Sequence, residues 1–329
     1  MEETLKILLI HVSGRIGDSL MATPAIYTVS KAFKNAKIDL LVHRNRVDLF
    51  QNIPNVNLIG SISEKRAWYK GWLSIKKYDY VIVFNHGNEL INIISYASRV
   101  GKKVIASRTE NPKINAKLFK VIPRLDNHIK AYLNYLSPLK IKKSYTKVKV
   151  FLTKDEIFFA KSLLKKNDLL SKFIVGYQIV SFPTRSYRDW PIENFITLSK
   201  KIIHTNPNVF FVVFGGIEDQ KKVGQFIECL PQDQCLNLSG KLSLRQTAAV
   251  MSMIDLYIGV DTGPSHMMSA FNVPMVCLYH STCPSMHLAP IGHSKFFAID
   301  HPKKSKATVS DSMDSILVNT VFKKINFLL

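Results

Sequence analysis

The chain has 329 residues, enough for two domains of roughly 100–200 residues each. Hydrophobic residues make up 47% of it and charged residues 21%, a composition typical of a folded globular protein. No apolar run approaches the roughly 18 residues that span a bilayer, and the acidic start lacks the basic segment of a signal peptide. We therefore expect neither a membrane-spanning nor a secreted protein, and the four cysteines fit a reducing cytoplasm.

The net charge of +21 is unevenly spread along the chain. Residues 1–150 hold 26 basic and 10 acidic residues, net +16, whereas residues 151–329 hold 19 and 14, net +5. We expect the N-terminal half to face something anionic: a nucleic acid, a membrane surface or a phosphorylated substrate. The alternative, a lysine-rich proteome with solvated faces, explains the asymmetry poorly.

In the N-terminal half, short β-rich runs alternate with helical patterns. We expect buried strands at residues 6–11, 37–42, 80–84 and 103–106. Apolar residues recur at helical spacing from Ala22 to Phe33. The dipeptide Thr23-Pro24 predicts that this helix starts there, with Thr23 as N-cap and Pro24 in the first turn.

A second series of the same kind begins near Phe173. We expect strands at residues 173–180, 209–214, 255–260 and 274–279, and helices near residues 193–204, 218–228, 243–252 and 264–271. The tail at residues 310–325 predicts a last helix with Ile316, Leu317, Val321 and Phe322 on one side. Near-continuous apolar strands that alternate with helices indicate parallel sheets covered on both faces.

The two series predict an α/β protein with two doubly wound domains, joined near the charged stretch 153–172. Such sheets bind ligands beyond the carboxyl ends of their strands. The first strand is followed there by Gly14, Gly17 and Asp18. The spacing of the glycines is not the dinucleotide fingerprint, so NAD binding gains little support. Asp18 is either a catalytic carboxylate or a helix cap, and the local sequence slightly favours the cap.

Polar residues also follow three strands of the second series. The loop after residue 180 holds two arginines and two hydroxyls that could bind a phosphate; the alternative is a surface turn in which Arg188 pairs with Asp189. After the next strand, Gly215-Gly216 predicts a tight turn. Glu218 either accepts a hydrogen bond from a ribose hydroxyl or, together with Asp219, complements a helix N-terminus.

The segment Asp261-Thr262-Gly263-Pro264, followed by His266, ends a strand and opens a helix. The free N–H groups of a helix start favour an anion, and Asp261, Thr262 and His266 should project toward one place. A histidine that only packs the helix is the alternative for His266. The density of polar side chains at this one turn favours a functional site.

The sequence predicts no metal site. It has no Asp-x-Asp pair of the kind that holds a nucleotide diphosphate through Mg²⁺ or Mn²⁺. Cys229 and Cys235, like Cys277 and Cys283, lack the C-x-x-C spacing of zinc ligands. We expect these cysteines to be buried apolar residues.

Together, these segments resemble glycosyltransferase family 9, the heptosyltransferases of lipopolysaccharide core assembly. In family order, the matching pieces are Gly17-Asp18 with Ala22-Thr23-Pro24-Ala25, Arg188-x-Trp190-Pro191, Gly215-Gly216, and Asp261-Thr262-Gly263-Pro264-x-His266 followed by Pro274 and Leu278. The segment from Asp261 to His266 is the most specific of them. The resemblance runs from residue 11 to about 290, nearly the whole chain.

The resemblance implies a GT-B fold, in which two Rossmann-like domains face a central cleft. It implies an N-terminal acceptor-binding domain over residues 1–160 and a C-terminal nucleotide-sugar-binding domain over residues 170–305. A last helix within residues 306–329 would pack back on the N-terminal domain. The implied enzyme is an inverting, metal-independent glycosyltransferase that uses ADP-heptose as donor substrate and needs no cofactor.

Site residues carry over from the family by position. Asp18 matches the general base, and we expect its neighbours Arg15 and Gly17 to bind the acceptor. The expected donor-binding residues are Thr184, Arg188, Glu218, Asp261, Thr262, Gly263 and His266. A lysine usually holds the pyrophosphate where this chain has Arg188. The compact ammonium is thereby replaced by a planar guanidinium that can donate two parallel hydrogen bonds. Many members read Gly-Pro-Thr where this chain reads His280-Ser281-Thr282-Cys283-Pro284.

The implied acceptor is a phosphorylated, Kdo-bearing inner-core glycolipid, which fits the basic N-terminal half. We expect a cytoplasmic monomer, peripheral at the anionic inner-membrane surface, that binds no nucleic acid. One alternative is a GT-B glycosyltransferase that uses another nucleotide sugar in cell-surface glycan synthesis. The other is a basic nucleic-acid-binding protein, although aromatic-basic RNA motifs and a helix-turn-helix signal are missing from the sequence.

Overall fold

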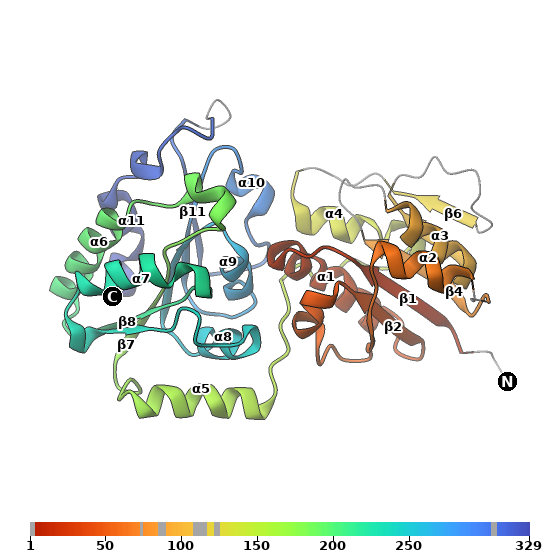
Figure 1. The fold of residues 1–329 in the computed structure, drawn as a ribbon, viewed down its shortest axis with the longest axis horizontal. Coiled ribbons are helices and arrows are strands. Elements are labelled where there is room, and N and C mark those ends of the chain that lie inside the picture. Colours follow the sequence, from red (N-terminus) through yellow and green to blue (C-terminus); the bar gives the residue numbers. More distant parts are fainter. Residues whose placement is uncertain (1–3, 73–74, 85–89, 108–116, 122–125, 304–307) are drawn as a thin grey trace. The chain divides into compact units, whose positions relative to one another are not determined.

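A computed structural model describes residues 4–72, 75–84, 90–107, 117–121, 126–303 and 308–329. The chain divides into two compact units, Met1–Phe151 and Leu152–Leu329, each built around its own sheet (Figure 1). Among the described residues, none of the helices has the length and apolar character that a membrane crossing requires.

The described part of the first unit forms a six-stranded parallel sheet flanked by helices. The strands are β1 (Lys6–His11), β2 (Lys37–Val42), β3 (Asn57–Ser61), β4 (Tyr78–Phe84), β5 (Gly101–Ala106) and β6 (Lys117–Lys120). The helices are α1 (Ile16–Ala32), α2 (Glu64–Trp72), α3 (Ile91–Val100) and α4 (His128–Asn134). The order β3-β2-β1-β4-β5-β6 is the doubly wound order, whose switch point lies between β1 and β4.

The second unit repeats this topology. Its strands are β7 (Phe173–Gln178), β8 (Val209–Val213), β9 (Cys235–Asn237), β10 (Leu256–Val260), β11 (Met275–Tyr279) and β12 (Phe296–Asp300). Its helices are α5 (Lys154–Lys166), α6 (Ile192–Thr205), α7 (Gln220–Glu228), α8 (Leu244–Met251), α9 (Gly263–Met268), α10 (Ser285–Leu288) and α11 (Val318–Ile325). The order β12-β11-β10-β7-β8-β9 has its switch point between β7 and β10. The prediction of two doubly wound α/β domains is therefore confirmed.

Helix α1 begins at Ile16, so the predicted start at Thr23 is wrong. Pro24 lies inside the helix and has no N–H to donate to the carbonyl of Leu20. The hydroxyl of Thr23 donates to that carbonyl at 2.6 Å instead, and it accepts from the backbone N–H of Lys149 at 2.9 Å. The hydrogen bonds of the buried Thr23 hydroxyl thus accommodate a proline within the helix.

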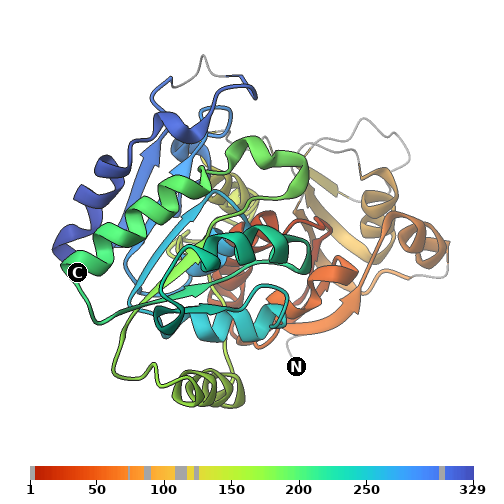
Figure 2. The ribbon, with the colours of Figure 1, turned by 60° about the vertical axis from the view of Figure 1, so that its left-hand side comes forward.

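The C-terminal segment packs on the second unit, contrary to the expectation that it would pack on the N-terminal domain. Val321 and Ile325 are fully buried in the core cluster of the second unit, and α11 lies alongside α6 (Figure 2). The indole N–H of Trp190 donates to the carbonyl of Ile316 at 2.8 Å. The helix is also shorter than expected, since it starts at Val318. Leu317, just before it, is 65% exposed.

Candidate functional site

A buried ion pair stands at the switch point of the second unit. Arg188 ends the short 3₁₀ segment Pro183–Arg188 that follows β7, and Asp261 directly follows β10. Nη1 of Arg188 donates to Oδ2 of Asp261 at 2.8 Å, and the two residues are only 5% and 4% exposed. They meet because β7 and β10 are paired in parallel, which brings the loops after both strands to one edge of the sheet.

Further side chains surround this pair. Nη2 of Arg188 donates to Sγ of Cys283 at 2.6 Å, and Nε2 of His266 lies 3.5 Å from Oδ1 of Asp261. Burial lowers the pKa of Arg188, but the charge of Asp261 and the neighbouring Cys283 outweigh it, so the pKa rises and the guanidinium stays charged. The buried Nε of Arg188 has no hydrogen-bond partner of good geometry among the described residues.

The predicted alternative of a surface turn joining Arg188 to Asp189 is wrong. Oδ1 of Asp189 accepts from the backbone N–H of Ser181 at 2.6 Å, and Oδ2 pairs with Nζ of Lys222 at 3.0 Å. Asp189 thereby stabilises the loop after β7 and links it to α7. This arrangement leaves Arg188 to turn inward toward Asp261.

The turn after β10 is held by buried hydroxyls. Ser265 donates to the carbonyl of Val260 at 2.6 Å, and its Oγ lies 2.8 Å from the hydroxyl of Tyr257. This network fixes the start of α9, a helix of six residues whose N-cap is Thr262. Asp261, Thr262, Gly263 and His266 thus stand at one turn, and of their side chains those of Asp261 and His266 approach each other.

Thr184 and Glu218, the other expected donor-binding residues, are exposed. Thr184 lies in the same 3₁₀ segment as Arg188, and Glu218 follows β8, the strand next to β7. Asp219, which the sequence placed with Glu218 at this helix N-terminus, accepts from the backbone N–H of Gly216 at 2.8 Å. Burial raises the pKa of this carboxyl, because the hydrogen bond from Gly216 offsets only part of the cost of burying its charge.

The cysteines differ in their surroundings, contrary to the expectation that all are buried apolar residues. Cys277 is buried in β11, whereas Cys229 is exposed and Cys235 and Cys283 are half-buried. Cys283 contacts the guanidinium of Arg188, a role that its sequence spacing did not signal. No group of three or more metal-ligating side chains occurs within the residues that the structure describes.

Asp18 stands at the switch point of the first unit, in the first turn of α1 directly after β1. The N-cap is Arg15, whose side chain is exposed, so Asp18 is not the helix cap. The hydroxyl of Ser13 donates to Oδ2 of Asp18 at 3.0 Å. Burial and, next, the charge of Asp18 raise the pKa of Tyr132 in α4, which places a fully buried phenol near this carboxylate. Gly17 adjoins Asp18 in the same turn.

Three basic residues missed by sequence reasoning follow β2, the strand beside β1. They are His43, Arg44 and Arg46. A Cβ on Gly14 would come within 3.3 Å of the His43 ring, so the loop before α1 passes close over it. Burial and the neighbouring Arg46 lower the pKa of His43. Their position after the predicted strand at residues 37–42 was the signal that could have found them.

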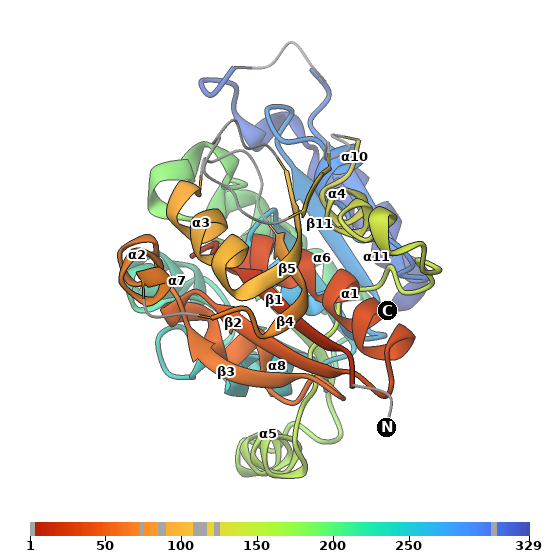
Figure 3. The same cartoon turned by 90° about the vertical axis from the view of Figure 1, so that its right-hand side faces the viewer.

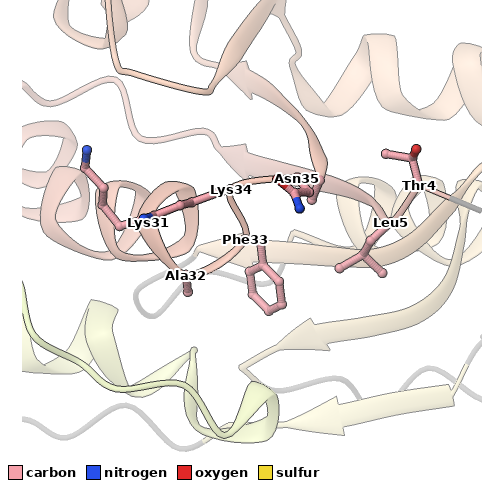
Figure 4. A pocket seen from close by; sticks show the side chains of 8 residues that line it. Thr4, Leu5, Lys31, Ala32, Phe33, Lys34 and Asn35 are labelled. Atoms are coloured by element: carbon pink, nitrogen blue, oxygen red, sulfur yellow. The ribbon is translucent and has the colours of Figure 1, made fainter. Parts of the chain in front are cut away.

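A cavity of about 540 Å³ lies at the other end of this sheet (Figure 4). Its walls are formed by Thr4 and Leu5 before β1 and by the segment 31–36 at the end of α1. The amino ends of the strands are not where doubly wound sheets bind ligands, so we do not assign it to the site. A smaller cavity of about 240 Å³ borders Asp189, Trp190 and Lys222, beside the loop that carries Arg188.

Comparisons with known proteins agree with this layout. The model of glycosyltransferase family 9 (heptosyltransferase) matches residues 132–316, more than half of the chain. Lipopolysaccharide heptosyltransferase 3 of Escherichia coli K12 is 23% identical over 280 residues, covering 81% of this chain and 80% of that protein.

Solved structures show the same fold. The glycosyl transferase family 9 structure from Veillonella parvula has a TM-score of 0.82 at 19% identity and covers 100% of this chain and 98% of its own. The structure of Escherichia coli ADP-heptose LPS heptosyltransferase II has a TM-score of 0.75 at 18% identity and covers 98% of both chains. The predicted GT-B fold is confirmed, and the chain belongs to glycosyltransferase family 9 and is a glycosyltransferase.

Proposed function

We propose that this enzyme transfers a heptose from ADP-heptose to an inner-core acceptor of lipopolysaccharide or lipooligosaccharide, with inversion at the anomeric carbon. The buried pair of Arg188 and Asp261, flanked by His266 at the switch point of the second unit, carries the proposal. A switch point is where a doubly wound sheet binds a nucleotide. Relatives named as heptosyltransferases support the choice of sugar.

The donor side of the proposed reaction belongs to the second unit. Arg188 is a cation held in place by Asp261, and a guanidinium suits the diphosphate of a nucleotide sugar. Thr262 and Gly263 open α9 beside Asp261 and add backbone N–H groups. Thr184 and Glu218, on loops at the same edge, would contact the nucleoside. As the bond between sugar and diphosphate breaks, Arg188 stabilises the negative charge that grows on the leaving ADP.

The acceptor side belongs to the first unit. In the proposed step, Asp18 removes a proton from an acceptor hydroxyl, whose oxygen attacks the anomeric carbon from the face opposite ADP. The carbon–oxygen bond to the diphosphate breaks, and ADP leaves with its electron pair. Arg15 and Gly17 adjoin Asp18, and Arg44 and Arg46 follow the neighbouring strand. This basic edge suits a phosphorylated glycolipid, and with it a monomeric enzyme associated with the cytoplasmic face of an anionic membrane.

A donor panel tests the proposal. The purified protein is incubated with a delipidated, phosphorylated Kdo acceptor and, separately, ADP-heptose, ADP-glucose, UDP-glucose and UDP-N-acetylglucosamine. Mass spectrometry should find an added heptose with ADP-heptose alone, and ADP should bind more tightly than UDP in calorimetry. Transfer from a UDP-sugar in place of ADP-heptose would favour the second candidate, a glycosyltransferase of another cell-surface glycan.

A further inference from the structure

The exposed face of α2 combines large aromatic and basic side chains. Trp68 is 54% exposed and Tyr69 is 72% exposed, while Ile75, just beyond the helix, is 80% exposed. These are the most exposed large apolar side chains in the described part of the first unit. Surface residues of this size standing together mark a place of contact rather than ordinary solvent exposure.

Helical spacing places Trp68 and Tyr69 side by side, next to Lys65. Lys65, Trp68 and Tyr69 stand at i, i+3 and i+4, and the two aromatic rings meet edge to face with centroids 5.2 Å apart. Arg66 and Lys70 form the next strip of the same face. Ala67, on the opposite side, is buried in the core of the first unit, where α2 packs against α3 (Figure 3).

The exposed charged residues of α2 and of the segment 75–77 are all basic. Lys76 and Lys77 follow α2 and are exposed like its three basic residues. The one acidic residue of the helix, Glu64, is engaged with the fold, because its Oε2 accepts from the backbone N–H of Asn92 at 3.2 Å. We call the set the α2 surface; it consists of Lys65, Arg66, Trp68, Tyr69, Lys70, Ile75, Lys76 and Lys77.

We infer that the α2 surface binds the headgroup region of an anionic lipid bilayer. The inference rests on the proposed function, since a lipid-linked acceptor brings the enzyme to a membrane. Tryptophan and tyrosine rings lie at the boundary of headgroups and acyl chains, while lysine and arginine reach the anionic headgroups. A protein partner fits less well, because lysine is depleted from protein interfaces and supplies four of the eight residues here.

Three other basic residues in the described part of the first unit contact neighbouring side chains. Nζ of Lys102 pairs with Asp79 at 2.9 Å, and Lys143 donates to Ser137 at 2.6 Å. Lys103 lies over the ring of Tyr80, 4.8 Å from its centroid. Lys77 of the α2 surface likewise lies over a ring, that of Tyr78, so the α2 surface is distinguished by the exposed aromatic side chains beside its basic residues.

Co-sedimentation of the full chain with phosphatidylglycerol or phosphatidylcholine vesicles tests the inference. Wild type should bind the anionic vesicles at low salt and leave them at high salt. The double variant Lys65→Glu/Arg66→Glu should lower the partition coefficient by at least about 20-fold, because each basic residue near an anionic surface contributes roughly a fivefold gain. The double variant Trp68→Ala/Tyr69→Ala should be released at lower salt than wild type, because the salt-insensitive apolar contribution is lost.

Matched controls lie on α5 of the second unit. Phe158 is 72% exposed, like Tyr69, and Lys165 and Lys166 are exposed. The variants Phe158→Ala and Lys165→Glu/Lys166→Glu should bind vesicles as wild type does. Equal losses in the α2 and α5 variants, or wild-type binding by both α2 variants, would overturn the inference and leave another surface or a protein partner for α2. Transfer to a soluble acceptor, measured in parallel, reports on the proposed function independently and should be unchanged in every variant.

Discussion

Asp18 and Arg188 carry the proposed chemistry, yet they are held in very different ways. Asp18 is half-buried and bonded to one hydroxyl, so its carboxylate can be changed with little effect on the fold. Arg188 is buried in an ion pair with Asp261, so it supports both stability and binding. Variants at the two sites therefore need different controls.

For Asp18, we expect the variant Asp18→Asn to lower kcat by roughly 10²–10⁴, because the amide cannot accept the proton. Donor affinity and the midpoint of thermal unfolding should stay near wild type. Steady-state kinetics with the soluble acceptor and calorimetry with ADP measure both. The variant Ser13→Ala, which removes only the hydrogen bond to Asp18, is the control and should retain most activity. Near-wild-type turnover of Asp18→Asn would argue that this carboxylate is structural.

For Arg188, we expect the variant Arg188→Ala to lower the free energy of unfolding by roughly 3–5 kcal/mol, because it leaves the Asp261 carboxylate buried without its partner. Urea denaturation measures this loss, which would otherwise be mistaken for a defect in binding. The variant Arg188→Lys keeps the charge and should lose less stability while still weakening ADP binding, since a lysine cannot replace the fork. If Arg188→Ala unfolds like wild type, the pair is not buried as described.

At the scale of elements, Trp190 links the loop after β7 to the C-terminal segment. It is 1% exposed, and its indole N–H donates to the carbonyl of Ile316. We expect Trp190→Phe to cost about 1–3 kcal/mol, because the buried carbonyl loses its donor. Limited proteolysis should then cut more readily between residues 308 and 317. The substitution Leu317→Ala, at an exposed neighbour, should leave both stability and proteolysis unchanged.

Helices α5 and α8 are neighbours (Figure 1), and an ion pair of Glu156 and Arg245 joins them and gives a second prediction at this scale. The hydrogen bond from Arg245 lowers the pKa of Glu156 below its ordinary value of 4.5. A lowered pKa in the folded state stabilises the protein above pH 4.5, and this contribution is lost as the pH falls through the folded-state value. Urea unfolding should therefore find Glu156→Gln less stable than wild type at pH 7, with the difference shrinking below pH 4.5. A difference that does not change with pH would mean that the charge of Glu156 is not responsible.

At the scale of the whole molecule, the proposed mechanism assigns the general base to the first unit and the diphosphate site to the second. Arg188 supplies a fixed positive charge for the leaving group, the task that a divalent cation performs in other transferases. We therefore expect turnover of the full chain to survive EDTA. The measurement is the initial rate before and after chelation, with MgCl₂ or MnCl₂ restored in a third arm. Loss of activity with EDTA and recovery with Mn²⁺ would contradict the metal-independent mechanism.

The sequence predicted the central strands of each sheet and did not predict the edge strands. The eight predicted strands are β1, β2, β4, β5, β7, β8, β10 and β11, and the four missed strands are β3, β6, β9 and β12. Central strands are covered on both faces and paired on both sides, so they need continuous apolar runs that a reader can recognise. Edge strands such as Asn57–Ser61 are only partly buried, and their sequences carry little of that signal.

The sequence by itself determined the fold class, the family and the loops that carry polar residues, because buried strands and glycine turns leave local patterns. The tertiary structure decided which side chains meet. Arg188 pairs with Asp261, 73 residues away, and not with its neighbour Asp189, because the sheet order places β7 beside β10. It also decided that α1 runs through Pro24, since the hydroxyl of Thr23 satisfies the freed carbonyl. The last helix packs its apolar face on the core of the second unit. The sequence pattern of a helix shows which face is apolar, but it does not show which core that face will contact.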